Sequence, residues 1–211
     1  MDTARVLQVA KAAARAAGAL ILSCSGRIAV DKTKASHQDL VTQTDRDCQT
    51  LIQQCVAEAF GDAHSLLGEE DVPPGAEAAR AAIADKLAAG GVLWIVDPID
   101  GTTNFVSGIP LSCVSIGVAF NGEVQVGVIY HPHLDELFHA VRGGGAFVND
   151  TPLRVAPCTA MKDALFGWGL HHARHVSKTM LRAADTFIDH CRGLRSLGSA
   201  ALMVRPRWLC I

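Results

Sequence analysis

Aromatic side chains are scarce in this sequence. They make up 5% of its 211 residues, whereas hydrophobic residues of all kinds make up 49%. The hydrophobic core must therefore be built mainly from Ala, Val, Leu and Ile side chains. A chain of this length buries roughly 70% of the surface that its unfolded form exposes, so it needs no cross-links to fold. We expect one compact domain or two tightly packed halves.

The sequence also lacks a disulfide framework and a zinc-binding pattern. Its seven cysteines are odd in number and scattered, and no two are spaced as C-x-x-C. This usage is typical of reduced thiols in a cytoplasmic protein. Histidines gather at positions 131–133 and 171–175, but no cysteine completes a zinc-ligand set beside them. We therefore expect ordinary surface histidines there.

Charge of one sign does not dominate either. The formal net charge is −2 and charged residues make up 19% of the chain. A chain balanced in this way has no general attraction to nucleic acid or to an anionic membrane. We also expect no signal peptide and no apolar run long enough to span a bilayer. The composition therefore predicts a protein that binds neither nucleic acid nor membrane.

Helices and strands are predicted to alternate along the chain. Apolar periodicity and turn residues place helices over residues 3–25, 45–60, 76–89 and 176–191, with Thr44 as the N-cap of the second. The predicted strands cover residues 64–67, 92–96, 113–120, 123–130 and 136–141, the last three as an antiparallel meander. This order predicts a layered α/β or α+β fold.

Two acids stand at the end of the apolar run in WIVDPIDGTTNF, residues 94–105. Asp97 and Asp100 are separated by a turn that contains Pro98, so their carboxylates can converge on one point. Converging carboxylates repel each other and are costly to bury without a cation. With the carbonyl of Ile99 as a further ligand, they suit a hard divalent ion such as Mg²⁺. A turn with exposed acids is the competing interpretation, because D-P-x-D turns are common.

The residues that follow these acids indicate an anion site. If a helical turn begins within residues 101–104, its free N–H groups point toward the carboxylates, as they do in phosphate sites. A metal site beside a phosphate site indicates metal-assisted phosphoryl chemistry. The hydroxyl of Thr102 could orient an attacking water in such a site.

Two further acidic segments supply candidate partners. Glu69, in LLGEED, also follows a short apolar strand, and two adjacent strands would bring it beside Asp97. Asp45, in DLVTQTD, could hydrogen-bond Thr102 and raise the basicity of its hydroxyl. The competing interpretations are a solvated acidic turn for Glu69 and a favourable position in the helix dipole for Asp45.

Four segments together resemble the motifs of the inositol monophosphatase family: DLVTQTD, LLGEED, WIVDPIDGTTNFVSGIP and GLRSLGSAA. The resemblance extends from the N-terminus to about residue 202, and residues 203–211 are interpreted as a divergent tail. It implies a layered αβαβα sandwich with an incomplete C-terminal part. It also implies Mg²⁺ dependence, lithium sensitivity, hydrolysis of phosphate monoesters and a homodimer.

The resemblance implies two metal sites. Glu69, Asp97 and the carbonyl of Ile99 would hold a first Mg²⁺, and Asp97 and Asp100 would hold a second. The family has a further aspartate ligand for the second metal near its C-terminus, whereas no acid follows Asp189 in this sequence. We therefore expect a complete first metal site and an impaired second one.

Catalytic and substrate-binding roles also follow from the resemblance. Glu69 and Thr102 would position and deprotonate the attacking water, Asp45 would support Thr102, and the N–H groups of Gly101 and Thr102 would bind the phosphate. The other residues implied to lie near the substrate are Asp100, Gly198, Ser199, Ala200 and Lys34. From the residues alone, Ser199 is equally a helix cap and Lys34, in a hairpin or extended loop at 27–42, a solvated surface lysine.

Three functions remain open from the sequence. The first is Mg²⁺-dependent hydrolysis of myo-inositol monophosphate. The second is a related phosphatase that acts on a nucleotide 3′-phosphate, fructose bisphosphate or histidinol phosphate. The third is a catalytically impaired chain that at most binds a full-length partner. A substrate panel separates the first two, and a metal titration identifies the third.

Overall fold

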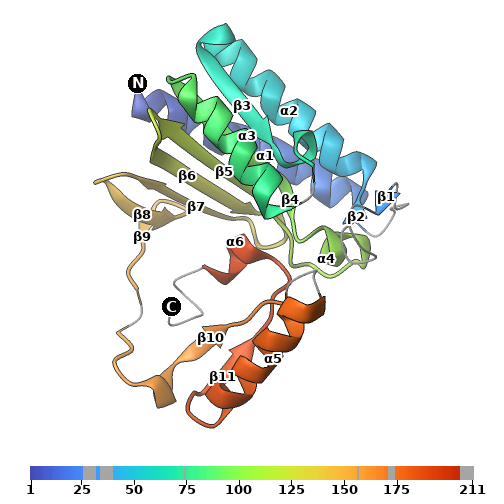
Figure 1. The fold of residues 1–211 in the computed structure, drawn as a ribbon. Helices are drawn as coiled ribbons and strands as arrows, with labels where there is room; N and C mark the ends of the chain where they lie inside the picture. The colour runs from blue at the N-terminus through green and yellow to red at the C-terminus, as the bar shows by residue number, and fades with distance from the viewer. Residues whose placement is uncertain (26–31, 34–39, 74, 156, 171–173, 205–211) are drawn as a thin grey trace.

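A mixed β-sheet forms the centre of the molecule. The computed structural model describes residues 1–25, 32–33, 40–73, 75–155, 157–170 and 174–204 (Figure 1). The sheet has seven strands in the order β3-β4-β5-β6-β7-β8-β9, with β3 and β4 parallel and all other neighbours antiparallel. The strands are β3 (His64–Gly68), β4 (Val92–Asp100), β5 (Cys113–Phe120), β6 (Glu123–His131), β7 (Glu136–Val141), β8 (Gly145–Val148) and β9 (Thr151–Pro152). The predicted meander is confirmed as β5, β6 and β7.

Two long helices, α1 (Thr3–Cys24) and α2 (Gln43–Phe60), cover one face of this sheet (Figure 1). Apolar side chains on that face of the strands, among them Trp94, Ile116 and Val128, form one core cluster with the buried side chains of both helices. The fold is therefore an α/β sandwich, as expected. The other described helices are α3 (Ala76–Ala88), α4 (Thr102–Val106), α5 (Arg174–Ile188) and α6 (Ala200–Met203), with 3-10 turns at Gly61–Ala63, Glu69–Asp71, Pro132–Leu134 and Met161–Asp163.

The opposite face of the sheet is covered only in part by the described residues. The short helix α6 lies against β5 and β6 there. Beside it is an apolar groove of about 370 Å³. Its lining includes Ile129, Phe138, Ala140, Leu153, Ala201 and Val204. Two small sheets complete the described strands: antiparallel β1 (Lys32–Thr33) with β2 (Leu40–Val41), and parallel β10 (Leu165–Gly167) with β11 (Gly193–Arg195).

The helix α1 meets the length and hydropathy of a membrane-spanning helix, with a mean hydropathy of 1.3 over its most apolar window. By these two criteria the expectation of no such run is wrong. In the structure, however, Ala10, Ala14 and Ala17 of α1 are fully buried in the core. Gly18 lies so close to the sheet that a Cβ there would be 2.4 Å from the ring of Tyr130. This is the packing of a core helix, in which small residues allow close approach.

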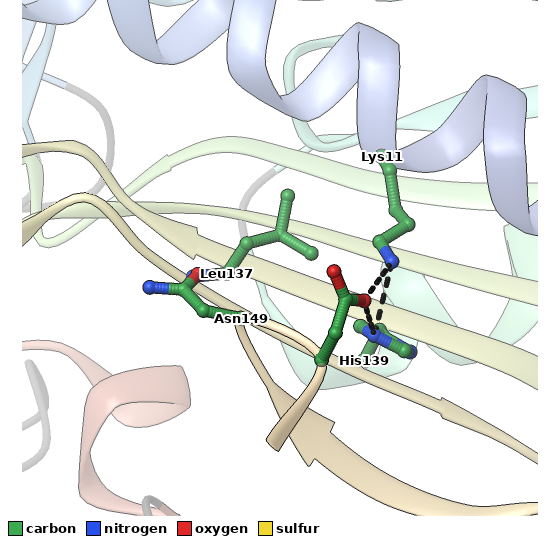
Figure 2. Close-up of polar contacts among 5 residues, drawn as sticks. Lys11, Leu137, His139 and Asn149 are labelled. Atoms are coloured by element: carbon green, nitrogen blue, oxygen red, sulfur yellow. Dashed lines mark hydrogen bonds and ion pairs between the residues drawn. The ribbon is translucent and has the colours of Figure 1, made fainter.

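A polar cluster of Lys11, His139 and Asp150 links α1 to β7. Lys11 Nζ lies 3.0 Å from His139 Nε2 and donates to Asp150 Oδ1 at 2.9 Å, and His139 Nε2 is 3.3 Å from the same carboxylate oxygen (Figure 2). His139 is buried and its ring stacks on Phe147. Burial, and then the charge of Lys11, lower the pKa of His139. The neutral imidazole is therefore the form that fits this cluster.

The start of α2 differs from the prediction. Its N-cap is Thr42, two residues before the predicted Thr44, and the helix begins at Gln43. Thr42 is extended, its hydroxyl accepts from the N–H of Asp45, and the carboxylate of Asp45 accepts from the N–H of Thr42 at 2.8 Å. This reciprocal capping box satisfies two backbone donors, whereas a cap at Thr44 would satisfy one.

Candidate active site

Glu69 and Asp97 are neighbours at the point where the pairing of two parallel strands ends. Gly68, the last residue of β3, pairs with Val96 of β4, so Glu69 and Asp97 each follow one member of this last pair. The two carboxyl groups lie close enough to interact electrostatically. Burial, followed by the charges of Glu69, Asp100 and Asp45, raises the pKa of Asp97 well above its usual value. The predicted proximity of Glu69 and Asp97 is confirmed.

One carboxylate oxygen of Asp97 accepts no hydrogen bond from the described residues. Oδ1 of Asp97 is buried and has no hydrogen-bond partner among the described residues. A buried, unpartnered carboxylate oxygen beside a second carboxylate is costly unless a cation binds to it. The carbonyl of Ile99 is on the same strand and is fully buried. These oxygens have the chemistry of a ligand set for a hard cation.

The expected link between Asp45 and Thr102 is present. Thr102 Oγ1 lies 3.3 Å from Asp45 Oδ1 and 3.0 Å from the carbonyl oxygen of Ile99, and its single proton can go to either acceptor. Asp45 is fully buried at the start of α2. Burial is the main cause of the raised pKa of Asp45. The hydrogen bonds with Thr42 lower this pKa, and the charge of Glu69 raises it further. The hydroxyl of Thr102 is thus held between α2 and the end of β4.

The turn between β4 and α4 requires glycine. Gly101 has φ +98° and is the N-cap of α4. A Cβ at this position would lie 2.8 Å from the carbonyl oxygen of Leu111 and 3.3 Å from that of Gly198. Both the backbone conformation and the lack of space therefore exclude a side chain. The turn brings the segment that precedes α6 against the first turn of α4.

Asp100 is directed toward α6. Its Oδ2 accepts from Ser199 Oγ at 2.6 Å and from the N–H of Ala201 at 2.6 Å, and its Oδ1 accepts from the N–H of Ala200 at 3.1 Å. Ser199 is also the N-cap of α6, since its hydroxyl accepts from the N–H of Leu202 at 3.2 Å. Asp100 thus binds the segment that was expected to contact the substrate.

This arrangement has a consequence for metal binding. No group of three or more His, Cys, Asp or Glu side chains in the described part of the chain is arranged to hold a metal ion. The pair Glu69 and Asp97 with the carbonyl of Ile99 fits one cation, because it offers two carboxylates and the unpartnered Oδ1. Asp100 instead has both oxygens occupied by α6. Lys34, predicted to lie near the metal, is outside the described residues.

Asn104 is a site residue whose role the sequence did not reveal. Its side-chain amide donates to the carbonyl oxygens of Leu111 and Leu197, both at 2.7 Å. Gly198 has φ +68°, and a Cβ there would lie 2.6 Å from this amide. Asn104 therefore holds the segment before α6 against α4. No short-range pattern could have shown this, since Leu197 is 93 residues away.

The fold and this site define the class of the protein: a layered α/β protein with paired acids beside a glycine turn. The family model described as the inositol monophosphatase family matches residues 2–205. The chain belongs to this family.

Individual relatives agree with this assignment. The chain is 37% identical to inositol monophosphatase 3 of Solanum lycopersicum, over 93% of this chain and 70% of that protein. It is 35% identical to inositol-1-monophosphatase of Bacillus subtilis, over 92% of this chain and 69% of that protein. The match to inositol monophosphatase 1 of Solanum lycopersicum, at 38% identity, spans 58% of that protein. The chain thus spans 58–70% of these relatives' length.

Solved structures of the family share the fold. The extragenic suppressor protein suhB of Bartonella henselae superposes with a TM-score of 0.80 at 33% identity, over 93% of this chain and 72% of that one. An IMPase of Thermotoga maritima gives a TM-score of 0.77 at 30% identity, over 96% of this chain and 70% of that one. The layered α/β architecture is therefore the family's own.

Proposed function

We propose that this protein hydrolyses a phosphate monoester and that its substrate is myo-inositol monophosphate. The observation that carries this proposal is the adjacent pair of Glu69 and Asp97 beside the Asp45–Thr102 hydrogen bond. The relatives named inositol monophosphatase support the substrate.

The proposed cofactor is Mg²⁺, held by Glu69, Asp97 and the carbonyl of Ile99. A bound Mg²⁺ supplies positive charge that acidifies water and stabilises negative charge on phosphate oxygens. The support for a cation here is Oδ1 of Asp97, which is buried and has no hydrogen-bond partner in the described part of the chain. Asp100 is proposed to act mainly on α6, so a second metal would be bound weakly.

Glu69 and Thr102 are proposed to prepare the attacking water. A Thr102 hydroxyl whose proton is directed to Asp45 presents its lone pairs to a water, which then donates one hydrogen to Thr102 and loses a proton to Glu69. The water oxygen bonds to phosphorus as the bond from phosphorus to the inositol oxygen breaks. The inositol oxygen takes a proton from solvent. No covalent phosphoenzyme forms.

We assign substrate binding to the glycine turn at the start of α4 and to the segment at the start of α6, which Asp100 and Asn104 hold together. The N–H groups of Gly101 and Thr102 are proposed to hold the phosphate. Gly198 and Ala200, which are both exposed, are proposed to contact the polyol, and buried Ser199 is proposed to shape this surface through Asp100. A homodimer and inhibition by lithium are further proposals that rest on family membership.

A substrate panel tests this function. The purified chain is incubated with myo-inositol 1-phosphate, a nucleotide 3′-phosphate, fructose 1,6-bisphosphate and histidinol phosphate, and phosphate release is measured with Mg²⁺ and with EDTA. We expect Mg²⁺-dependent release, highest from the inositol ester. Highest release from another ester would overturn the substrate, and no release from any would favour the catalytically impaired alternative.

A further inference from the structure

Gln49 is a buried polar residue one helical turn beyond Asp45. The two residues are four positions apart on α2, so their side chains leave the helix on the same face. Gln49 is 7% exposed, which is unusual for a glutamine. The structure thus places a second buried polar side chain of α2 next to the site.

The amide of Gln49 binds the turn that carries Glu69. Its Oε1 accepts from the N–H of Glu70 at 3.1 Å, and its Nε2 donates to Asp71 Oδ1 at 3.0 Å. The other oxygen of Asp71 accepts from the N–H of Gly68 at 3.2 Å. These three bonds hold the backbone before and after Glu69.

The close approach of Gln49 also accounts for the glycine before Glu69. Gly68 has φ −90°, a conformation open to any residue, so backbone geometry alone does not require glycine. A Cβ at Gly68 would, however, lie 2.0 Å from Gln49 Oε1 and 2.1 Å from Gln49 Cδ. Glycine is needed because the amide occupies the space of a side chain.

We propose that Gln49 is a positioning residue that fixes Glu69 beside Asp97, an inference that rests on the proposed function and deepens it. One helix, α2, then holds both groups that prepare the water, Thr102 through Asp45 and Glu69 through Gln49. A neutral amide suits this place, because it makes the two bonds without adding negative charge to Glu69, Asp97 and Asp71.

The test uses three variants of the whole chain. Gln49→Met keeps the size of the side chain and removes both hydrogen bonds. Gln49→Glu places a carboxylate against Asp71. The double variant Gln49→Glu with Asp71→Asn exchanges donor and acceptor, so that the same hydrogen bonds form with unchanged net charge. Gln53→Met, on the exposed side of α2, is the matched control.

The readouts are kcat and KM for myo-inositol 1-phosphate, the Mg²⁺ concentration for half-maximal rate, Mg²⁺ binding by calorimetry, and the thermal midpoint. Loss of an outer-shell partner costs roughly 10–100-fold in metal affinity or activity. We expect Gln49→Met and Gln49→Glu to lower kcat and weaken Mg²⁺ binding by such factors with KM unchanged. The double variant should recover most of the loss, and Gln53→Met should match the parent chain.

Two outcomes would overturn the inference while the proposed function stands. In the first, the parent chain is active and Gln49→Met has the same kcat and Mg²⁺ binding. In the second, Gln49→Met lowers only the thermal midpoint. A double variant as poor as Gln49→Glu would overturn it too. A parent chain that binds Mg²⁺ without turnover would contradict the proposed function alone, and the calorimetric comparison of the variants would then decide the inference. A parent chain that neither binds Mg²⁺ nor turns over contradicts both.

Discussion

Thr102 and Asp45 are 57 residues apart in the chain, and their side chains meet at 3.3 Å between Oγ1 and Oδ1. Asp45 is fixed by its reciprocal capping bonds with Thr42, and Thr102 begins α4 directly after the glycine turn. The hydroxyl is therefore held by two rigid helix starts. This relationship supports the water-positioning role proposed for Thr102.

Removing either partner of this bond should slow hydrolysis. We expect Thr102→Ala to lower kcat by about 10²–10⁴-fold, as for loss of a proton-transfer partner. Asp45→Asn should cost about 10–100-fold, because it acts through Thr102. Steady-state kinetics with Asp47→Asn, an exposed acid on the same helix, as control measure both effects. Equal rates for Asp45→Asn and the control would show that the contact has no catalytic importance.

Asp97→Asn should separate metal binding from folding. The variant removes one of two adjacent carboxylates and with it the charge repulsion, so in EDTA its thermal midpoint should equal or exceed that of the parent chain. Mg²⁺ at 100 times its dissociation constant should stabilise the parent by about 2.7 kcal/mol. Differential scanning calorimetry with and without Mg²⁺ should show no such gain for the variant. A variant that Mg²⁺ stabilises as strongly as the parent would exclude Asp97 as a ligand.

Gly101→Ala should damage both stability and activity. The positive φ costs about 1–3 kcal/mol for a residue with a side chain, and the contact with the carbonyl of Leu111 adds to it. Gly122→Ala is the matched control, since Gly122 has φ +84° with open space around it. Urea unfolding should show the larger loss at Gly101. Equal losses at the two glycines would mean that the crowding at Gly101 relaxes without cost.

His139 should make stability depend on pH. Its pKa is lowered in the folded state, so the unfolded chain takes up a proton first as the pH falls. Stability should therefore be constant well above about pH 6.5, the ordinary histidine value, and decrease below it. His64 and His133, whose pKa values burial also lowers, contribute in the same direction.

The variant His139→Phe isolates the contribution of His139. It preserves the stacking on Phe147 and removes the titrating group. Urea unfolding at several pH values between 5 and 8 should give a smaller loss of stability in acid for the variant than for the parent chain. Parallel pH profiles would contradict the effect of the Lys11–His139–Asp150 cluster.

Local patterns predicted the elements and the acidic pair because those depend on neighbouring residues. Parallel pairing of β3 with β4 places Glu69 next to Asp97, and this follows from two apolar runs that each end in acids. The capping box joins Thr42 to Asp45, whereas Thr44 was predicted as the N-cap, so the start of α2 was misplaced by two residues.

The contacts that join α4 and β4 to the segment before α6 were not predicted from the sequence. Asp100 bonds Ser199 across 99 residues, and the amide of Asn104 bonds Leu197 across 93. These contacts depend on how the chain between β9 and α6 folds back onto α4. The same limit applies to Gln49, whose burial depends on how α2 packs on the Glu69 turn.

The most direct test of the central claim is phosphate release from myo-inositol 1-phosphate by the purified chain, measured across a Mg²⁺ titration beside Asp97→Asn. The account predicts release that rises with Mg²⁺, is absent in EDTA, and is lost in the variant. Release that is independent of Mg²⁺ or unchanged by Asp97→Asn would contradict it.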